Sequence, residues 1–242
     1  MNIGAVLAFE GVTAGYGKLT VLQDVTLSLG EGEVLAVLGA NGSGKSTLLK
    51  TAIGLTLVTG GGVHLQGEEI TDLPPHARAA RGVGYVPQTQ NVFPELTVLD
   101  NLLMGGFLRG AAARSETEPV YDLFPRLRDR RKSLARDLSG GERRMLSIGL
   151  TLMLRPRLLL LDEPSSDLSP IMVTQVFDAI RRIRIEQQIP ILLVEQNVRA
   201  ALSIADRVCV MVRGRQALDV PAGELDMTAL RELFMDGGVR SR

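Results

Sequence analysis

The chain has 242 residues, of which 45% are hydrophobic and 22% are charged. This balance predicts a globular fold with a sizeable core and excludes disorder over most of the chain. The 27 basic and 27 acidic residues cancel, so the net charge does not indicate a nucleic-acid partner. One cysteine excludes an intrachain disulfide, and two histidines that are not at ligand spacing argue against a structural zinc site. No apolar run reaches the roughly 18 residues needed to span a membrane.

The first part of the chain reads mainly as strands. Hydrophobic alternation or short apolar runs predict strands over residues 7–13, 21–29, 33–38, 61–67 and 83–86. A turn is expected at Gly15-Tyr16-Gly17. Apolar residues recur with helical spacing over residues 45–53, which predicts a helix there.

The remainder of the chain predicts a helical insert followed by further alternation. Residues 89–155 are richer in Ala, Leu and Arg, with helical apolar spacing. Beyond them we expect a helix over 173–185 and strands over 158–161, 191–194 and 208–212. The pattern predicts an α/β parallel sheet within a single domain, 1–242, whose core covers about residues 1–88 and 156–242. Residues 237–242 are expected to be a frayed tail.

The strongest chemical signal is a glycine-rich loop between a predicted strand and a predicted helix. Its sequence is Gly39-Ala40-Asn41-Gly42-Ser43-Gly44-Lys45-Ser46-Thr47. Such glycines let successive backbone N–H groups point at an anion, and the following helix places its positive end there. The pattern predicts a phosphate-binding loop, with Lys45 for the β- and γ-phosphates and Ser46 for Mg²⁺. The alternative, a flexible Gly/Ser linker, does not explain the strand and the helix on either side.

A second signal is the pair Asp162 and Glu163 after four consecutive leucines. A buried strand would deliver both carboxylates to its carboxyl end, where α/β sheets place their ligands. Asp162 suits Mg²⁺, and Glu163 suits polarising an attacking water. An ordinary turn is the alternative, but the phosphate loop upstream favours the site.

A third signal is Ser139-Gly140-Gly141-Glu142 at the start of an apolar helical pattern. Ser139 and Glu142 have the spacing of a capping box. Each glycine costs a helix about 1 kcal/mol relative to alanine, and a cap alone does not need them. A backbone that contacts a phosphate does need them, and both interpretations are compatible.

Together these motifs resemble the nucleotide-binding subunits of ATP-binding cassette (ABC) transporters, over nearly the whole chain. Residues 138–142 match the signature motif of that family. The resemblance implies a P-loop NTPase core with a mainly parallel sheet, an N-terminal antiparallel β subdomain and an inserted α-helical subdomain. It also implies ATP and Mg²⁺ as ligands, and a composite site in which residues 139–142 of one chain face the phosphate loop of another.

The resemblance assigns roles to weaker positions. Tyr16 would stack on adenine, Gln88 would contact Mg²⁺ and the attacking water, and loop 166–169 would reach the partner subunit. This loop ends in Ser169 where the family often has Asp. Gln196 stands where most members carry a histidine that contacts the γ-phosphate. Glutamine donates a hydrogen bond but cannot shuttle a proton near neutral pH, so Gln196 is expected to position rather than transfer.

The segment Leu193-Val194-Glu195-Gln196-Asn197-Val198 is similar to ATP-binding subunits of branched-chain amino-acid importers. The partners implied are transmembrane permease subunits, a second ATPase subunit and, indirectly, a periplasmic substrate-binding protein. The chain would then lie peripherally on the cytoplasmic face of the bacterial inner membrane. Arg143 and Arg144 replace that subfamily's usual glutamines, and we interpret them as a solvated surface pair.

Three alternatives stay open at this point. The arginine pair keeps open a lipopolysaccharide-export ATPase, which would use the same chemistry. A non-transport cassette ATPase usually has two cassettes or a long coiled coil, for which 242 residues leave no room. A subunit that binds nucleotide with weak hydrolysis is the third. Elsewhere, Cys209 is predicted to be a buried strand residue, and the basic run 126–132 to be a solvated helix surface.

Overall fold

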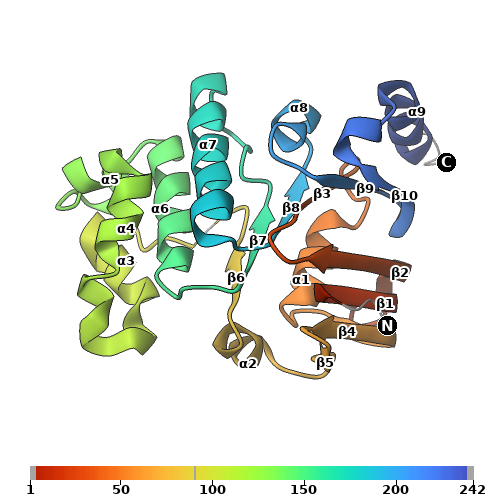
Figure 1. Ribbon diagram of the computed structural model, residues 1–242, viewed down its shortest axis with the longest axis horizontal. Helices are drawn as coiled ribbons and strands as arrows, with labels where there is room; N and C mark the ends of the chain where they lie inside the picture. Colours follow the sequence, from red (N-terminus) through yellow and green to blue (C-terminus); the bar gives the residue numbers. More distant parts are fainter. Residues whose placement is uncertain (1–3, 90, 239–242) are drawn as a thin grey trace.

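The strands form two sheets in the computed structural model, which describes residues 4–89 and 91–238 (Figure 1). An antiparallel sheet has the order β2-β1-β4-β5, with bounds β1 (Ala5–Tyr16), β2 (Leu19–Gly30), β4 (Leu57–Leu65) and β5 (Glu68–Glu69). The larger sheet has the order β10-β9-β3-β8-β7-β6, with bounds β3 (Val34–Leu38), β6 (Val83–Val86), β7 (Leu158–Asp162), β8 (Ile191–Glu195), β9 (Arg207–Val212) and β10 (Arg215–Pro221). All neighbouring pairs in this larger sheet are parallel except β9 and β10.

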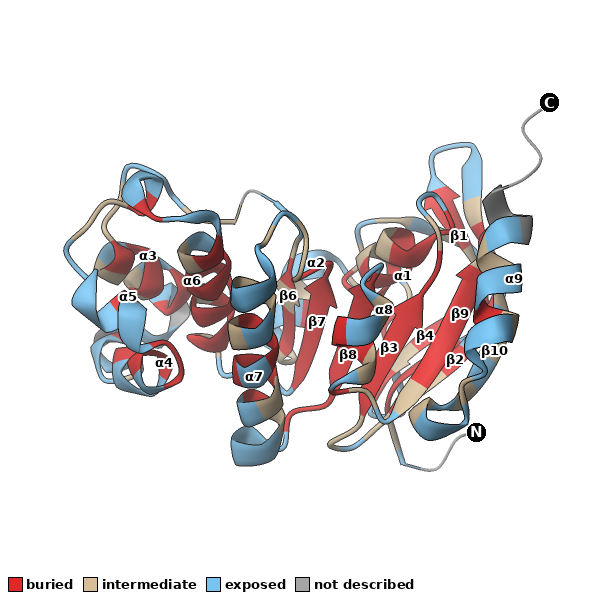
Figure 2. Cartoon of the chain, turned by 90° about the horizontal axis from the view of Figure 1, so that it is seen from above, coloured by how far each residue is buried: buried red, intermediate tan, exposed pale blue. Residues whose placement is uncertain are grey.

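Helices cover both faces of the larger sheet and extend beyond one of its edges. Their bounds are α1 (Lys45–Ala52), α2 (Pro75–Ala80), α3 (Val98–Gly105), α4 (Thr117–Leu123), α5 (Pro125–Asp129), α6 (Gly140–Leu152), α7 (Pro170–Gln187), α8 (Val198–Leu202) and α9 (Met227–Gly238). Short 3₁₀ helices occur at Phe107–Arg114, Ala135–Asp137 and Ala222–Glu224. Helices α3 to α6 gather at the end of the molecule beyond β6, as Figures 1 and 2 both show. Within the described ranges, no helix combines the length and apolar character needed to cross a bilayer.

The central strands β3, β7 and β8 are buried along their whole length, because the sheet is covered on both faces (Figure 2). On one face, Ala36 and Leu193 pack in a cluster with α6, α7 and α8. On the other face, Val37 and Leu192 pack with α1 and the antiparallel sheet. Side chains that alternate between two apolar layers explain why these strands are almost purely hydrophobic.

The expected fold class is confirmed: a mainly parallel sheet, an N-terminal antiparallel sheet and a helical insertion between β6 and β7. The strand expected at 61–67 in fact begins at Leu57, because β4 pairs with β1 along its length. Gly61 adopts a φ of +71°, and a Cβ there would lie 2.3 Å from the carbonyl oxygen of Glu10. The glycines therefore allow two strands to approach closely rather than ending a strand.

Some elements are absent from the sequence-based prediction, namely α2, α8, β10 and α9. The expected tail is wrong at Gly237 and Gly238, which continue α9, while residues 239–242 lie outside the described ranges. Helix α9 is held because Leu230, Leu233 and Phe234 pack against the core cluster under the larger sheet. This contact comes from tertiary packing, so local composition did not indicate it.

Candidate functional site

The phosphate loop joins the end of β3 to the start of α1, as expected. Gly42 and Gly44 have φ values of +77° and +104°, which lie in the left-handed region that favours glycine. The Ser43 hydroxyl oxygen is buried and has no hydrogen-bond partner in the part of the chain that the structure describes. An unpaired buried donor at a helix N-terminus suits a phosphate oxygen.

Lys45 is almost fully buried, with 4% of its surface exposed. Its ammonium donates to the carbonyl oxygens of Gly39 (2.9 Å) and Ala40 (3.1 Å) and lies 3.8 Å from Glu163 Oε1. Burial lowers the pKa of Lys45, while the charges of nearby carboxylates, Glu163 above all, oppose that shift. The ammonium is thus held within the phosphate loop, close to the backbone of its first two residues.

Ser46 and Asp162 meet at the end of β7. The Ser46 hydroxyl donates to Asp162 Oδ1 at 2.9 Å, and the hydroxyl of Tyr85, on the neighbouring strand β6, donates to Oδ2 at 3.2 Å. Burial raises the pKa of Asp162, and these two hydrogen bonds oppose the increase. Burial also raises the pKa of Tyr85, which keeps its hydroxyl a donor. Tyr85 was missed by the sequence analysis, although it lies in a predicted strand shortly before Gln88.

Glu163 receives hydrogen bonds from two glutamines on different loops. Gln88 Nε2 donates to Oε2 at 2.9 Å, and Gln196 Nε2 donates to Oε1 at 2.8 Å. Gln196 Nε2 also donates to Asn41 Oδ1 in the phosphate loop. The backbone of Glu163 has a φ of +46°, a conformation that costs a non-glycine residue about 1–2 kcal/mol. The structure therefore brings together Gln88, Glu163 and Gln196, the residues expected for catalysis, at a position where the backbone of Glu163 is strained.

Glu195 organises the two loops beside this carboxylate. Its side chain is 1% exposed and accepts hydrogen bonds from the backbone N–H groups of Ser165 (2.8 Å), Gln196 (3.0 Å) and Asn197 (3.1 Å). The Ser165 hydroxyl also donates to it, at 2.8 Å. Burial raises the pKa of Glu195, and the hydrogen bonds oppose that increase. Glu195 thus connects the loop after β7 to the loop that carries Gln196.

The signature-like segment opens α6 with a complete capping box. Ser139 N–H donates to Glu142 Oε2 at 2.8 Å, and Glu142 N–H donates to Ser139 Oγ at 3.3 Å. A Cβ on Gly140 would meet open space, whereas one on Gly141 would lie 2.1 Å from Met172 Cε on α7. Gly141 therefore lets the Met172 side chain pack directly against the backbone of α6, a packing role that the sequence did not indicate. The segment lies among the helices of the insert, away from the phosphate loop at α1 (Figure 1).

Tyr16 forms the last residue of β1 rather than part of the expected turn, which begins one residue later. Tyr16 is 41% exposed, and the centre of its ring lies 5.9 Å from Lys50 Nζ on α1, within cation–π distance. An exposed ring beside the helix that follows the phosphate loop is available for stacking on a base.

One expectation about the arginine pair is wrong. Arg143 is exposed, but Arg144 is 8% exposed and not part of a solvated pair. Its position on α6 is on the same helical face as Gly141, Met145 and Ile148, and this spacing was the available signal. Ser169 caps α7, accepting from Met172 N–H at 3.5 Å. Cys209 is buried in β9 as expected.

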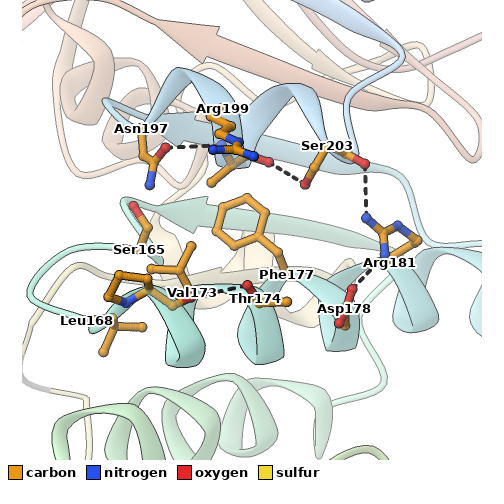
Figure 3. A pocket seen from close by; sticks show the side chains of 12 residues that line it. Ser165, Leu168, Val173, Thr174, Phe177, Asp178, Arg181, Asn197, Arg199 and Ser203 are labelled. Carbon is orange, nitrogen blue, oxygen red and sulfur yellow. Dashed lines mark hydrogen bonds and ion pairs between the residues drawn. The ribbon is translucent and has the colours of Figure 1, made fainter.

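A pocket of about 530 Å³ lies between α7 and α8 (Figure 3). Ser165 and Asn197, both held by Glu195, lie at one end, and Phe177 points into the space between the helices. At the other end Arg181 donates to Asp178 Oδ1 at 2.6 Å and to the carbonyl oxygen of Ser203 at 3.1 Å. No phosphate-loop residue lines this pocket, so it is separate from the candidate nucleotide site.

The oxygen ligands of the site fit a hard cation that binds with a nucleotide. Across the described ranges, no three His, Cys, Asp or Glu side chains are grouped to hold a metal by themselves. The hydroxyl of Ser46 and the carboxylate of Asp162 are adjacent, and both are oxygen donors of the kind Mg²⁺ prefers. Mg²⁺ usually takes only one or two protein ligands and completes its shell with phosphate oxygens and water.

This loop, carboxylate pair and fold define an ATP-binding cassette, and comparison with known proteins agrees. Residues 22–166 match the model of the family described as "ABC transporter". The chain belongs to this family: it is an ATP-binding subunit of an ABC transporter, and its activity is ATP hydrolysis. A solved cassette, MJ1267 in its ADP conformation, has the same fold, with a TM-score of 0.84 and 24% identity over 98% of this chain and 99% of that one.

Three curated relatives define the similarity more finely. The chain is 41% identical to the high-affinity branched-chain amino acid transport ATP-binding protein BraG of Pseudomonas aeruginosa, over 96% of this chain and all of BraG. It is 44% identical to the probable branched-chain amino acid transport ATP-binding protein LivF of Archaeoglobus fulgidus, over 88% of this chain and 91% of LivF. The lipopolysaccharide export protein LptB of Escherichia coli is 32% identical, over 87% of this chain and 88% of LptB.

Proposed function

We propose that ATP hydrolysis by this chain powers the import of branched-chain or related amino acids through separate transmembrane permease subunits. Its greater identity to BraG and LivF than to LptB supports import over lipopolysaccharide export. The chain would bind peripherally to its permeases at the cytoplasmic face of a bacterial inner membrane. A periplasmic substrate-binding protein would deliver the amino acid, and nucleic acid has no part in the cycle.

Nucleotide binding is assigned to the phosphate loop, Gly39 to Thr47, and to Tyr16. The backbone N–H groups of the loop and Lys45 would bind the β- and γ-phosphates, and the exposed Tyr16 would stack its ring on adenine. Ser46, Asp162 and Gln88 would hold Mg²⁺, which when bound neutralises charge on the phosphates. The Ser46–Asp162 contact of 2.9 Å supports this placement.

Glu163 is the proposed general base, and the observation that carries this role is its position between Gln88 and Gln196. Both amides donate to the carboxylate, so they orient it and leave it free to accept a proton. The attacking water would transfer its proton to Glu163 as its oxygen bonds to the γ-phosphorus and the bond to the ADP oxygen breaks. Gln196 therefore positions the base, since an amide has no pKa near neutrality.

A second ATPase subunit, identical or different, is needed to complete each site. Residues 139–142 open α6 among the insert helices, while the phosphate loop opens α1, which packs against strands of both sheets (Figure 1). A head-to-tail partner would bring its own Ser139, Gly140, Gly141 and Glu142 to the γ-phosphate of this chain. The N-terminus of α6 supplies N–H groups and a positive dipole end for that contact.

The test is amino-acid uptake by proteoliposomes that contain this chain, its permeases and the partner ATPase, with the substrate-binding protein added outside. When ATP and this chain are both on the inner side of the vesicles, labelled leucine should accumulate inside. Glu163→Gln should abolish this uptake while ATP still binds. Lipopolysaccharide extraction without leucine uptake would support the export alternative. A wild-type assembly that binds ATP with no turnover above that of Glu163→Gln would support the weak-hydrolysis alternative.

A further inference from the structure

Arg144 is a buried cation whose hydrogen bonds all reach the catalytic segments. Its Nη1 donates to the carbonyl oxygen of Pro87 at 2.9 Å, and its Nη2 donates to that of Gln88 at 2.6 Å. Nη2 also lies 3.4 Å from the carbonyl oxygen of Glu163. One guanidinium therefore contacts the main chain on both sides of the Gln88–Glu163 hydrogen bond.

The segment around Gln88 depends on such a contact, because it lies beyond the last paired residue of β6, Val86. The sheet therefore does not fix the Gln88 carbonyl group. Its partner Glu163 has a left-handed backbone that its surroundings must maintain. A planar guanidinium with several N–H donors can bond to several carbonyl groups at fixed angles.

Burial lowers the pKa of Arg144, but the charges of Glu195 and Asp162 act in the opposite direction. A guanidinium stays protonated in proteins, so its donors are always available. Its neighbour Arg143 is exposed and donates instead to the carbonyl oxygen of Leu138, two residues before α6 begins. The two adjacent arginines thus provide a matched pair, one at the site and one at the surface.

We propose that Arg144 is a positioning residue for ATP hydrolysis, which fixes Gln88 and Glu163 relative to each other and to the helix that carries Gly140 and Gly141. This inference rests on the proposed role of Glu163 as the base. Arg144 does not touch the nucleotide-binding loop, so its loss should affect turnover and not ATP affinity. A glutamine at this position has a shorter side chain and a single nitrogen donor, which cannot span three carbonyl groups.

The experiment compares Arg144→Gln, Arg144→Lys, the surface control Arg143→Gln, and Glu163→Gln in the full chain. The measurements are kcat and KM for ATP, equilibrium ATP affinity, the melting temperature, and amide hydrogen exchange over residues 86–89. Arg144→Gln should lower kcat at least about tenfold, leave ATP affinity within about twofold, and speed exchange at 86–89. Arg144→Lys should recover part of kcat because an ammonium reaches a single carbonyl group. Arg143→Gln should match the wild type.

Equal kcat and equal exchange in Arg144→Gln and Arg143→Gln would overturn the proposal. A parallel loss of ATP affinity and kcat would also overturn it, because that pattern indicates a general structural role. If Arg144→Gln does not fold, Arg144→Lys decides by the same two readouts. Retained turnover in Glu163→Gln would instead show that Glu163 is not the base. In that case, hydrogen exchange at residues 86–89 would still test whether Arg144 fixes the segment around Gln88.

Discussion

Replacing Gln196 with alanine removes one of the two amides that orient the Glu163 carboxylate. In the wild type, Gln196 Nε2 is shared between Glu163 Oε1, at 2.8 Å, and Asn41 in the phosphate loop. After the substitution Gln88 still donates to Oε2 at 2.9 Å, and Lys45 lies 3.8 Å from Oε1. Oε1 then loses its hydrogen bond from Gln196 and keeps only the longer contact with the Lys45 ammonium, so the carboxylate spends less time in the orientation that activates water.

The size of the effect follows from the type of bond that is lost. A hydrogen bond to a charged group contributes about 1.5–3 kcal/mol, and about 1.4 kcal/mol corresponds to a tenfold change in rate. If this stabilisation is realised in the transition state, kcat should fall by about 10–150-fold. ADP affinity should change little, because ADP lacks the γ-phosphate at which the base oriented by Gln196 would act.

Turnover is measured as phosphate release from pH 6 to 8, with and without the partner subunits. Gln187→Ala is the control, because Gln187 is exposed at the end of α7. Gln196→His should keep activity, since a neutral imidazole also donates, and it should add a pH dependence near about 6–7 that the wild type lacks. An active wild type whose alanine variant turns over at the same rate would refute the positioning role.

Three further variants test other parts of the site and its packing. Lys45→Ala should reduce ATP affinity at least about 100-fold in equilibrium titration, through the loss of charge-assisted bonds to phosphate, while far-UV circular dichroism shows a native fold. Burial raises the pKa of Asp162, so on acidification this side chain loses its charge at a higher pH than an exposed aspartate does. The Mg²⁺ dependence of ATP binding should therefore weaken as the pH falls towards the pKa of Asp162. Asp162→Asn should remove this pH dependence. The same shift means that ionisation of Asp162 lowers folding stability as the pH rises through its raised pKa. Gly141→Ala should leave the free energy of unfolding in urea within about 1 kcal/mol of the wild type, because a gain of about 1 kcal/mol in helix propensity is offset by displacement of the Met172 side chain. In a Met172→Ala background, where most of that side chain is absent, the same change should be more favourable; additive effects of the two changes would contradict this contact.

The parts of the site that sequence alone predicted are those encoded by adjacent residues. The phosphate loop combines its glycines, lysine and hydroxyls within nine positions, and the strand before Asp162 shows its burial in four leucines. Their geometry follows from local backbone rules, so no distant contact is needed to recognise them.

The remainder depends on contacts between distant segments. Glu195 is the last residue of an apolar strand, and the partner that fixes its role, Ser165, is thirty positions away. Arg144 was assigned to the surface because it is charged, although its helical spacing placed it on the apolar face of α6. Edge strand β10 alternates between exposed and half-buried residues, a pattern too weak to predict a strand. At Arg144 the charge was misleading, because its hydrogen-bond partners lie on segments distant in the sequence.

Cys209 makes this protein well suited to site-directed labelling. It is the only thiol in the sequence, it is buried in β9, and burial raises its pKa to about 12, so almost none of it is thiolate at neutral pH. Maleimide dyes and spin labels react with thiolate, so the folded wild type should give almost no background. A single cysteine placed on the insert or beside Tyr16 would carry a probe without first removing the native one. The silent thiol also becomes a reporter of global unfolding, since it reacts only when the larger sheet opens.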